Sequence, residues 1–272
     1  MIAPPAFNPT SFAAQLAAKK RSSWSRPQPP TQAKIKIAAE LCAVPESCIQ
    51  SALDQNLLYF TTSREGIQAW VVTDPTRNAA VAYRLDGQPW ELVSLRTRRP
   101  ISGPHRVLPA SISGWPVGLP QSAQAPAIAI VELGVDFICA LHLNWCAARE
   151  HVIAPVALLS HVPIAEQALE RFHDKHICLF PHTDTPQEVH ELWSDQLRSA
   201  GALEVEEYSF AGLVNPDGSS AQNLRDFLHL DVDQWEIHRD EIENAMHFGP
   251  ISKPRTFSPQ AINQGVEHGG PF

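Results

Sequence analysis

The chain has 272 residues, of which 44% are hydrophobic, so it is long and apolar enough to build one large domain or two small ones. No run approaches the roughly 18 apolar residues of a membrane helix, and prolines at positions 4, 5 and 9 interrupt any signal-peptide core. The net charge of −8 is unevenly divided: residues 1–126 carry 13 Lys and Arg against 7 Asp and Glu, and residues 127–272 carry 8 against 22. We therefore expect a cytoplasmic protein without membrane contact, whose basic first half attracts nucleic acid and whose acidic second half does so only through cations.

The first 58 residues predict an arm followed by two helices. Residues 1–34 are rich in Pro, Ala, Ser and Gln with a basic cluster, which is typical of a disordered arm. Residues 35–58 have apolar residues at helical spacing, and Pro45 fits the first turn of a second helix. Two short helices around a turn are compatible with a helix-turn-helix or with a simple packing role.

Residues 35–118 are expected to form a small α+β domain. Residues 68–84 (QAWVVTDPTRNAAVAYR) predict a hairpin whose turn is the Asp-Pro-Thr-Arg-Asn segment. An arginine-rich stretch follows, with Trp115 close behind it, and it is compatible with a phosphate-contact surface or with an exposed loop next to a core tryptophan. The predicted nucleic-acid contacts are Arg96, Arg98, Arg99 and Arg106.

Residues 125–234 alternate between apolar strands and helices, with a Pro/Gln/Ala linker at 116–126 leading into them. Strands are predicted at 127–132, 152–160, 176–181 and 203–210, and helices at 136–148, 164–172, 186–201 and 223–229. This alternation with short connections predicts a parallel α/β sheet with flanking helices. Residues 235–272 are predicted to be a flexible tail.

Two of these strands end in residues that can bind metal. The run AIAIVELGVD contains Glu132 and closes on Asp136, and the run HICLFPHTDT carries His182 and Asp184 at its end. Ligands of open parallel sheets bind at the carboxyl edge of the strands, so we expect these side chains to converge there as a metal site. The five cysteines lie in apolar stretches without a CxxC pair, which argues against a zinc site or a disulfide framework.

A glutamate at the end of a first strand, an aspartate four positions later, and a later strand that ends in His-Thr-Asp together resemble the Toprim domain. This is the catalytic fold of bacterial-type primases, topoisomerases and some nucleases, and the resemblance covers roughly residues 127–230. The hairpin and the Gly-Trp-Pro-Val-Gly segment also resemble the domain that precedes Toprim in primase-like proteins of phages and mobile elements. The resemblance implies catalytic roles for Glu132 and Asp184, and a metal set of Glu132, Asp136, His182, Asp184 and Asp226.

The sequence departs from the Toprim pattern at three points. Leu133 stands where the E-G-x-x-D motif has glycine, and His182 replaces the first acid of the Asp-x-Asp motif. Only Asp226 remains of a downstream Lys-Asp-x-x-Asp segment. The expected cofactor is Mg²⁺ or Mn²⁺, although an imidazole ligand also favours softer metals. Each residue has a structural alternative, such as a helix cap for Asp136 or Asp184 and a hydrogen bond for His182.

The function implied by this resemblance is metal-dependent nucleotidyl transfer of the primase type in the DNA replication of a phage or mobile element. The expected partners are nucleotides, single-stranded DNA or a DNA/RNA hybrid, and a replicative helicase. Two alternatives remain open: a Toprim-class nuclease, and a catalytically degenerate module that binds nucleic acid or a helicase. The phosphate loop GxxxxGK[ST] is absent from the sequence, so an ATP-driven helicase is not expected.

Overall fold

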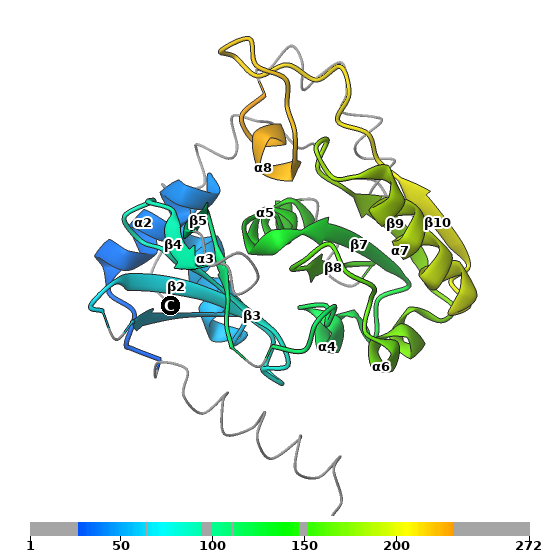
Figure 1. Cartoon of the computed structure of the whole chain (residues 1–272), viewed down its shortest axis with the longest axis horizontal. Helices are drawn as coiled ribbons and strands as arrows, with labels where there is room; N and C mark the ends of the chain where they lie inside the picture. Colours follow the sequence, from blue (N-terminus) through cyan, green and yellow to red (C-terminus); the bar gives the residue numbers. More distant parts are fainter. Residues whose placement is uncertain (1–26, 64, 94–99, 110, 147–151, 231–272) are drawn as a thin grey trace, which may run out of the picture.

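The computed structural model describes residues 27–63, 65–93, 100–109, 111–146 and 152–230 (Figure 1). Its helices are α2 (Gln32–Cys42), α3 (Glu46–Asp54), α4 (Leu119–Ser122), α5 (Leu133–Cys146), α6 (Glu166–Leu169), the 3-10 turn η1 (Glu170–Phe172), α7 (Gln187–Ser199) and α8 (Leu224–Phe227). Its strands are β1 (Leu58–Thr62), β2 (Gln68–Thr73), β3 (Ala80–Arg84), β4 (Trp90–Val93), β5 (Pro100–Gly103), β6 (Arg106–Val107), β7 (Ala127–Glu132), β8 (Ile153–Leu158), β9 (His176–Phe180) and β10 (Glu204–Glu207). No helix within the described ranges has both the length and the apolar composition to cross a bilayer.

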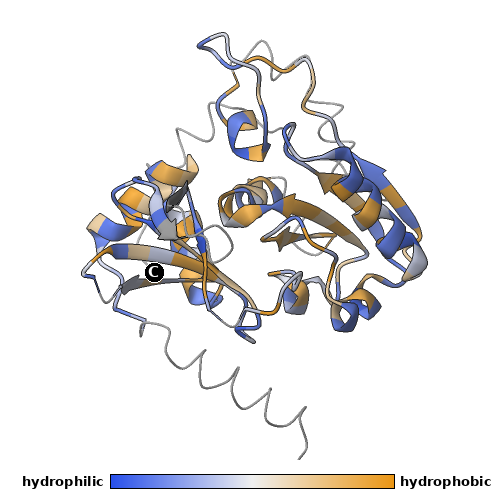
Figure 2. Ribbon diagram, in the orientation of Figure 1, coloured by the Kyte–Doolittle hydropathy of each residue, from blue (hydrophilic) through white to orange (hydrophobic). Residues whose placement is uncertain are grey.

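A four-stranded parallel sheet forms the second half of the molecule and confirms the predicted α/β class. Its strand order is β10-β9-β7-β8, and every neighbouring pair is parallel. All residues of the central strand β7 are buried, whereas the edge strand β10 is largely exposed; Figure 2 shows this as an orange β7 and a mostly blue β10. A central strand covered on both faces accounts for the unbroken apolar run AIAIVE.

Successive side chains of β7 enter two different apolar layers, as the period of a strand requires. Ala129 and Val131 pack in the layer that contains α5, and Ile128 and Ile130 pack in the layer that contains α6 and α7. The predicted helix after residue 186 begins at Gln187, and Gly201 follows its end with a φ of +87°, as expected at a helix C-terminus. The sheet is therefore flanked by helices on both faces, and all its strands run toward the same carboxyl edge.

An antiparallel sheet with the order β1-β2-β3-β6, accompanied by the β4-β5 hairpin, precedes the parallel sheet. The predicted hairpin is confirmed: β2 and β3 pair with Thr73 opposite Ala80. Asp74 holds the connecting turn, because its carboxylate accepts hydrogen bonds from the Asn78 backbone at 3.2 Å and from the Thr76 hydroxyl at 2.8 Å. The two predicted helices around Pro45 are also present as α2 and α3.

The described residues of both halves share one apolar core. Ala38 of α2, Ile49 of α3 and Trp70 of β2 belong to the same buried cluster as Val131 of β7 and Phe137 of α5. The helices α2 and α3 therefore have the packing role that the sequence left open. In Figure 1 the helices and strands of the first half lie on one side of α5 and the parallel sheet on the other.

Two predicted boundaries differ from the structure. Helix α2 begins at Gln32, inside the predicted arm, and the Gln28 amide donates to the Phe60 carbonyl at 2.8 Å. The predicted linker also packs, because Val117 pairs with Ala157 at a bridge and Leu119 is buried. Local composition at these positions is polar or proline-rich, but tertiary contacts order the chain there. Residues 1–26 and the predicted tail lie outside the described residues.

Candidate functional site

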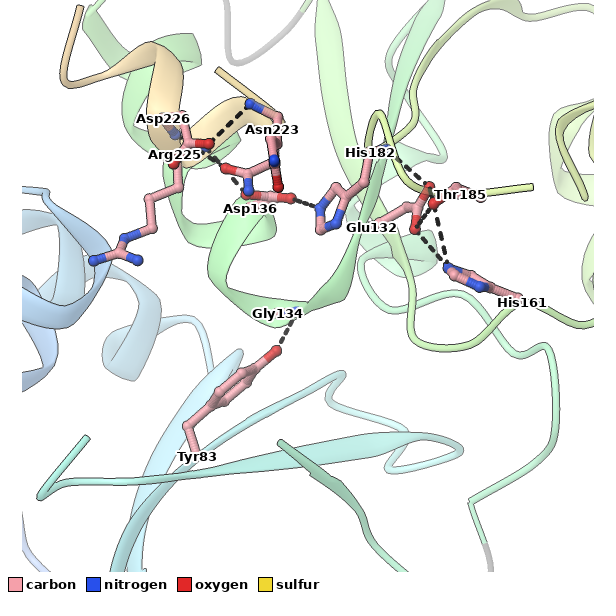
Figure 3. Close-up of polar contacts among 11 residues, drawn as sticks. Tyr83, Glu132, Gly134, Asp136, His161, His182, Thr185, Asn223, Arg225 and Asp226 are labelled. Atoms are coloured by element: carbon pink, nitrogen blue, oxygen red, sulfur yellow. Dashed lines mark hydrogen bonds and ion pairs between the residues drawn. The ribbon is translucent and has the colours of Figure 1, made fainter. Parts of the chain in front are cut away.

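Glu132 ends the central strand β7, and its carboxylate is enclosed by donors from the two neighbouring strand ends (Figure 3). After β9, the backbone amide of His182 donates to Oε1 at 3.0 Å, and the Thr185 hydroxyl lies 2.8 Å from Oε1 and 2.9 Å from Oε2. After β8, Nε2 of the half-exposed His161 lies 2.8 Å from Oε2. The predicted convergence at the carboxyl edge therefore occurs, and it takes the form of a hydrogen-bonded carboxylate that is only 2% exposed.

Leu133 turns the chain directly from β7 into α5. Its φ is +63°, the left-handed region in which a residue other than glycine is uncommon. This is the position at which the Toprim motif has glycine. Helix α5 consequently begins at Leu133 and not at the predicted residue 136, so Asp136 lies buried in its first turn and is not its N-cap.

Asp136 forms a buried ion pair with His182 (Figure 3). Its Oδ2 is hydrogen-bonded to Nε2 of His182, and its Oδ1 accepts from the Arg225 amide at 3.2 Å. Burial raises the pKa of the Asp136 carboxyl, and the hydrogen bond from His182 only partly opposes this. Burial alone would lower the pKa of His182, but the hydrogen bond and negative charge of Asp136 outweigh it and raise that pKa above 6.5. Asp136 thus favours the positively charged form of His182, which lies beside two carboxylates.

This pair predicts that stability falls as the pH rises. A histidine whose pKa is raised on folding contributes stability that is complete below pH 6.5 and is lost as the pH passes its folded pKa. We expect the wild-type free energy of unfolding to decrease from pH 6.5 upward relative to that of His182→Gln, in urea titrations at matched pH. A constant difference between the two proteins across this range would show that His182 does not hold a proton for Asp136.

The other two predicted acids lie in different environments. Asp184 is exposed and has no hydrogen bond to another described residue. Asp226 stabilises the start of α8: its amide donates to the Asn223 side chain at 3.0 Å, and its Oδ2 accepts from the Gln222 amide at 2.9 Å. This reciprocal arrangement is a helix cap, one of the structural roles that short polar side chains fill.

In this arrangement the carboxylates of Glu132 and Asp136 are held by protein donors, and a bound divalent cation would have to share or displace these hydrogen bonds. Both oxygens of Glu132 and both oxygens of Asp136 already accept hydrogen bonds from protein donors, and His182 is paired through its Nε2. Magnesium requires hard oxygen ligands that are free to complete a near-octahedral shell. No group of three or more His, Cys, Asp or Glu side chains within the described ranges is placed to hold a metal ion.

A pocket of about 420 Å³ opens between the two halves of the molecule, and we call it the Trp70 pocket. Its floor contains Trp70 and Tyr83, whose rings stack with centroids 4.5 Å apart. The Tyr83 hydroxyl accepts a hydrogen bond from the Gly134 amide at 2.7 Å, which fixes the antiparallel sheet against the first turn of α5. The residues that give the pocket its chemical character are Trp70, Tyr83, Asp136, His182, Asp184 and Arg225.

Two residues that line this pocket each have a buried N–H donor without an acceptor among the described residues. Nε1 of Trp70 and Nε of Arg225 are buried, and neither has a hydrogen-bond partner in the described part of the chain. In Figure 3 the Arg225 guanidinium extends away from Asp136 toward the N-terminal helices. Because an unsatisfied buried donor costs about 1–3 kcal/mol, such groups usually mark the position of a missing acceptor.

The predicted arginine surface is described only at Arg106, since residues 96, 98 and 99 lie outside the described part of the chain. The Arg106 guanidinium lies over the ring of Trp90, 5.8 Å from its centroid. It is not among the residues that line the Trp70 pocket.

The sequence reasoning missed His161, Thr185, Trp70 and Arg225. Two of these follow the same rule that identified Glu132, because His161 comes three residues after β8 and Thr185 follows β9. Trp70 and Arg225 lie more than 150 positions apart in the sequence, so only the folded chain places them in one pocket.

No protein-family model and no curated protein matches this chain. Among solved structures, it is similar to the primase fragment of the bacteriophage T7 primase-helicase protein, with 11% sequence identity and a TM-score of 0.46. The alignment covers 76% of this chain and 72% of that one. A similarity at this level does not assign the chain to a family.

Proposed function

We propose that the chain is a Toprim-like protein that binds a nucleotide or single-stranded nucleic acid in the Trp70 pocket, in the replication machinery of a phage or mobile element. The observation that carries the proposal is the pair of buried donors, Trp70 Nε1 and Arg225 Nε, which lack acceptors in a pocket with an aromatic floor. Phosphate oxygens and the ring nitrogens and carbonyls of bases are acceptors of the required kind.

The charges of the pocket support a ligand with separated polar and anionic groups. Arg225 contributes positive charge, and the raised pKa of His182 favours its charged form, while Asp136 and Asp184 contribute carboxylates and Asn223 an amide. Arg84 lines the same pocket, but its guanidinium is paired with Asp86 at 2.5 Å. Arg225, whose Nε has no acceptor among the described residues, lines this pocket together with two aromatic rings, and arginine with aromatic side chains is a combination used in the recognition of single-stranded nucleic acid.

Of the three activities implied by the Toprim resemblance, binding without metal chemistry agrees best with the geometry. His182 holds both carboxylates, because its backbone amide donates to Glu132 and its ring is hydrogen-bonded to Asp136. Nucleotidyl transfer of the primase type is the second candidate, and the convergence of β7, β8 and β9 at one edge favours it. It would require Glu132 and Asp136 to exchange their present hydrogen bonds for metal bonds.

A matched pair of tryptophan variants tests the binding proposal. Trp70→Phe keeps an aromatic ring but replaces the buried indole with a smaller ring that has no N–H. We expect the affinity for a labelled oligothymidylate, measured by fluorescence anisotropy in EDTA, to fall by about tenfold. Trp90→Phe is the control, because the Trp90 indole already donates to the Ala82 carbonyl at 3.0 Å and lies outside the pocket. It should lower stability and leave the affinity unchanged.

The contribution of the Arg225 charge to binding is tested in the same assay. We expect Arg225→Gln to weaken binding and to reduce its salt dependence by about one phosphate contact. Arg198→Gln, in α7, removes the same charge at an exposed position outside the pocket. It should change neither the affinity nor its salt dependence. Equal effects of Trp70→Phe and Trp90→Phe, or of the two arginine changes, would contradict the assignment of this pocket.

A further inference from the structure

A second cavity, of about 310 Å³, lies between α3, α5 and β8, and we call it the Asn144 pocket. Its size is at the lower end of the roughly 300–1,000 Å³ of small-molecule sites. Its buried apolar lining residues are Ala52, Leu57, Phe137, Ile153, Ala154 and Pro155, and neutral polar side chains such as Ser47, Ser51, Gln55 and Gln121 lie at its exposed rim. None of the residues that line the Trp70 pocket lines this one.

No charged side chain is present in the described lining of the Asn144 pocket. Its two titratable lining groups are neutral near pH 7: burial raises the pKa of Cys48 to about 12 and lowers the pKa of His142 to about 4. A charged ligand would therefore lose its hydration without gaining a counter-ion, which is costly. The pocket selects for neutral molecules.

Asn144, which lines this pocket, has a buried polar atom without a partner among the described residues. Asn144 is 3% exposed, and its amide nitrogen donates to the Ile153 carbonyl at 2.5 Å, but its Oδ1 has no hydrogen-bond donor among the described residues. A buried carbonyl oxygen without a donor is as unusual as an unpaired N–H, and it specifies what a ligand must provide.

The rim of the pocket adds an aromatic surface. Trp145 is 60% exposed, and its ring stacks on that of His142 with centroids 6.4 Å apart and an interplanar angle of 25°. Large exposed aromatic side chains at the mouth of an apolar cavity are characteristic of binding sites, because their rings bury apolar area with little loss of freedom.

We propose that the Asn144 pocket binds a neutral, flat aromatic or heteroaromatic small molecule that donates one hydrogen bond to Asn144 Oδ1. The apolar wall supplies most of the affinity, and the buried acceptor Asn144 Oδ1 fixes the orientation of the ligand. The site does not depend on the nucleic-acid function of the Trp70 pocket, so either assignment can fail without the other.

Indole is a suitable probe, because it is neutral, flat and has one N–H donor. We expect an amide-proton NMR titration of the full chain to give saturable shifts of the Asn144 side-chain amide and the Trp145 indole resonances. Methylation of the ring nitrogen removes the donor, so 1-methylindole should bind about fivefold more weakly. Indole-3-acetate, which carries a carboxylate, should bind at least about tenfold more weakly.

Two variants on one helix provide the matched control. Ser51→Trp places a large ring in the pocket from its exposed rim, and we expect it to abolish the shifts. Gln50→Trp adds the same side chain at the neighbouring exposed position, outside the pocket, and should bind indole as the wild type does. The proposal is overturned if indole gives no saturable shifts, if Ser51→Trp binds it unchanged, or if 1-methylindole binds as tightly as indole.

Discussion

Replacement of Glu132 by alanine is expected to lower the free energy of unfolding by about 3 kcal/mol or more, because each hydrogen bond to a buried charged group contributes about 1.5–3 kcal/mol. The carboxylate accepts from the His182 amide and the Thr185 hydroxyl and contacts His161, so its removal leaves buried donors unpaired at the ends of β8 and β9. Urea denaturation in EDTA measures this directly.

The sign of this change distinguishes two descriptions of the site. If Glu132 stood among repelling carboxylates that await a cation, its removal in EDTA would relieve repulsion and raise stability. If it is held by protein donors, its removal lowers stability. Asp184→Ala is the matched control at the same sheet edge, and because Asp184 is exposed we expect a change within about 0.5 kcal/mol. A Glu132→Ala protein more stable than the wild type would refute the hydrogen-bonded description.

Replacement of Gly134 by alanine is expected to cost about 2–3 kcal/mol, at the upper end of the range for overpacking a core. A Cβ at this position would lie 2.9 Å from both Cβ and Cγ2 of Val72 and 3.0 Å from Cε2 of Tyr83. Val72 is fully buried in β2 and cannot move away, so the first turn of α5 would have to separate from the antiparallel sheet. The bond between the Gly134 amide and the Tyr83 hydroxyl would then lengthen or break.

This change should also weaken ligand binding, because Tyr83 and Asp136 both line the Trp70 pocket and the separation of their elements alters its shape. Gly103→Ala is the control, since a Cβ there meets only the His105 carbonyl at an ordinary 3.7 Å. We expect the control to change stability by less than about 0.5 kcal/mol. A Gly134→Ala protein as stable as the Gly103→Ala protein would show that the two halves do not approach each other as closely as the structure has them.

The sequence predicted the parallel sheet well because its strands are buried on both faces. AIAIVE and HICLF are unbroken apolar runs of strand length with polar residues at their ends, and both are strands in the structure. The rule that ligand-binding residues follow such strands placed Glu132 beside His182 and Asp136 correctly. It could not show that donors would occupy the carboxylates, because the hydrogen bonds of His161 and Thr185 to Glu132 form only in the folded chain.

Features that depend on contacts between residues far apart in the sequence were harder to predict. The segment 116–126 has the composition of a linker, yet Val117 and Leu119 are buried because β8 and neighbouring elements cover them. The early start of α5 depends on a leucine with a left-handed backbone, which residue preferences do not predict. The Trp70 pocket requires β2, β3, α5 and α8 to meet, and no local pattern encodes that meeting.

The most direct test of the central claim is to observe the Trp70 indole N–H by NMR while an oligothymidylate or ATP is added in EDTA. This proton has no acceptor in the described structure, so a ligand that binds as proposed will give it one. We predict a saturable downfield shift and slowed solvent exchange of this resonance, without added metal, and loss of both in Trp70→Phe. Binding that saturates while the Trp70 resonance stays unchanged, or binding that requires magnesium, would contradict the account.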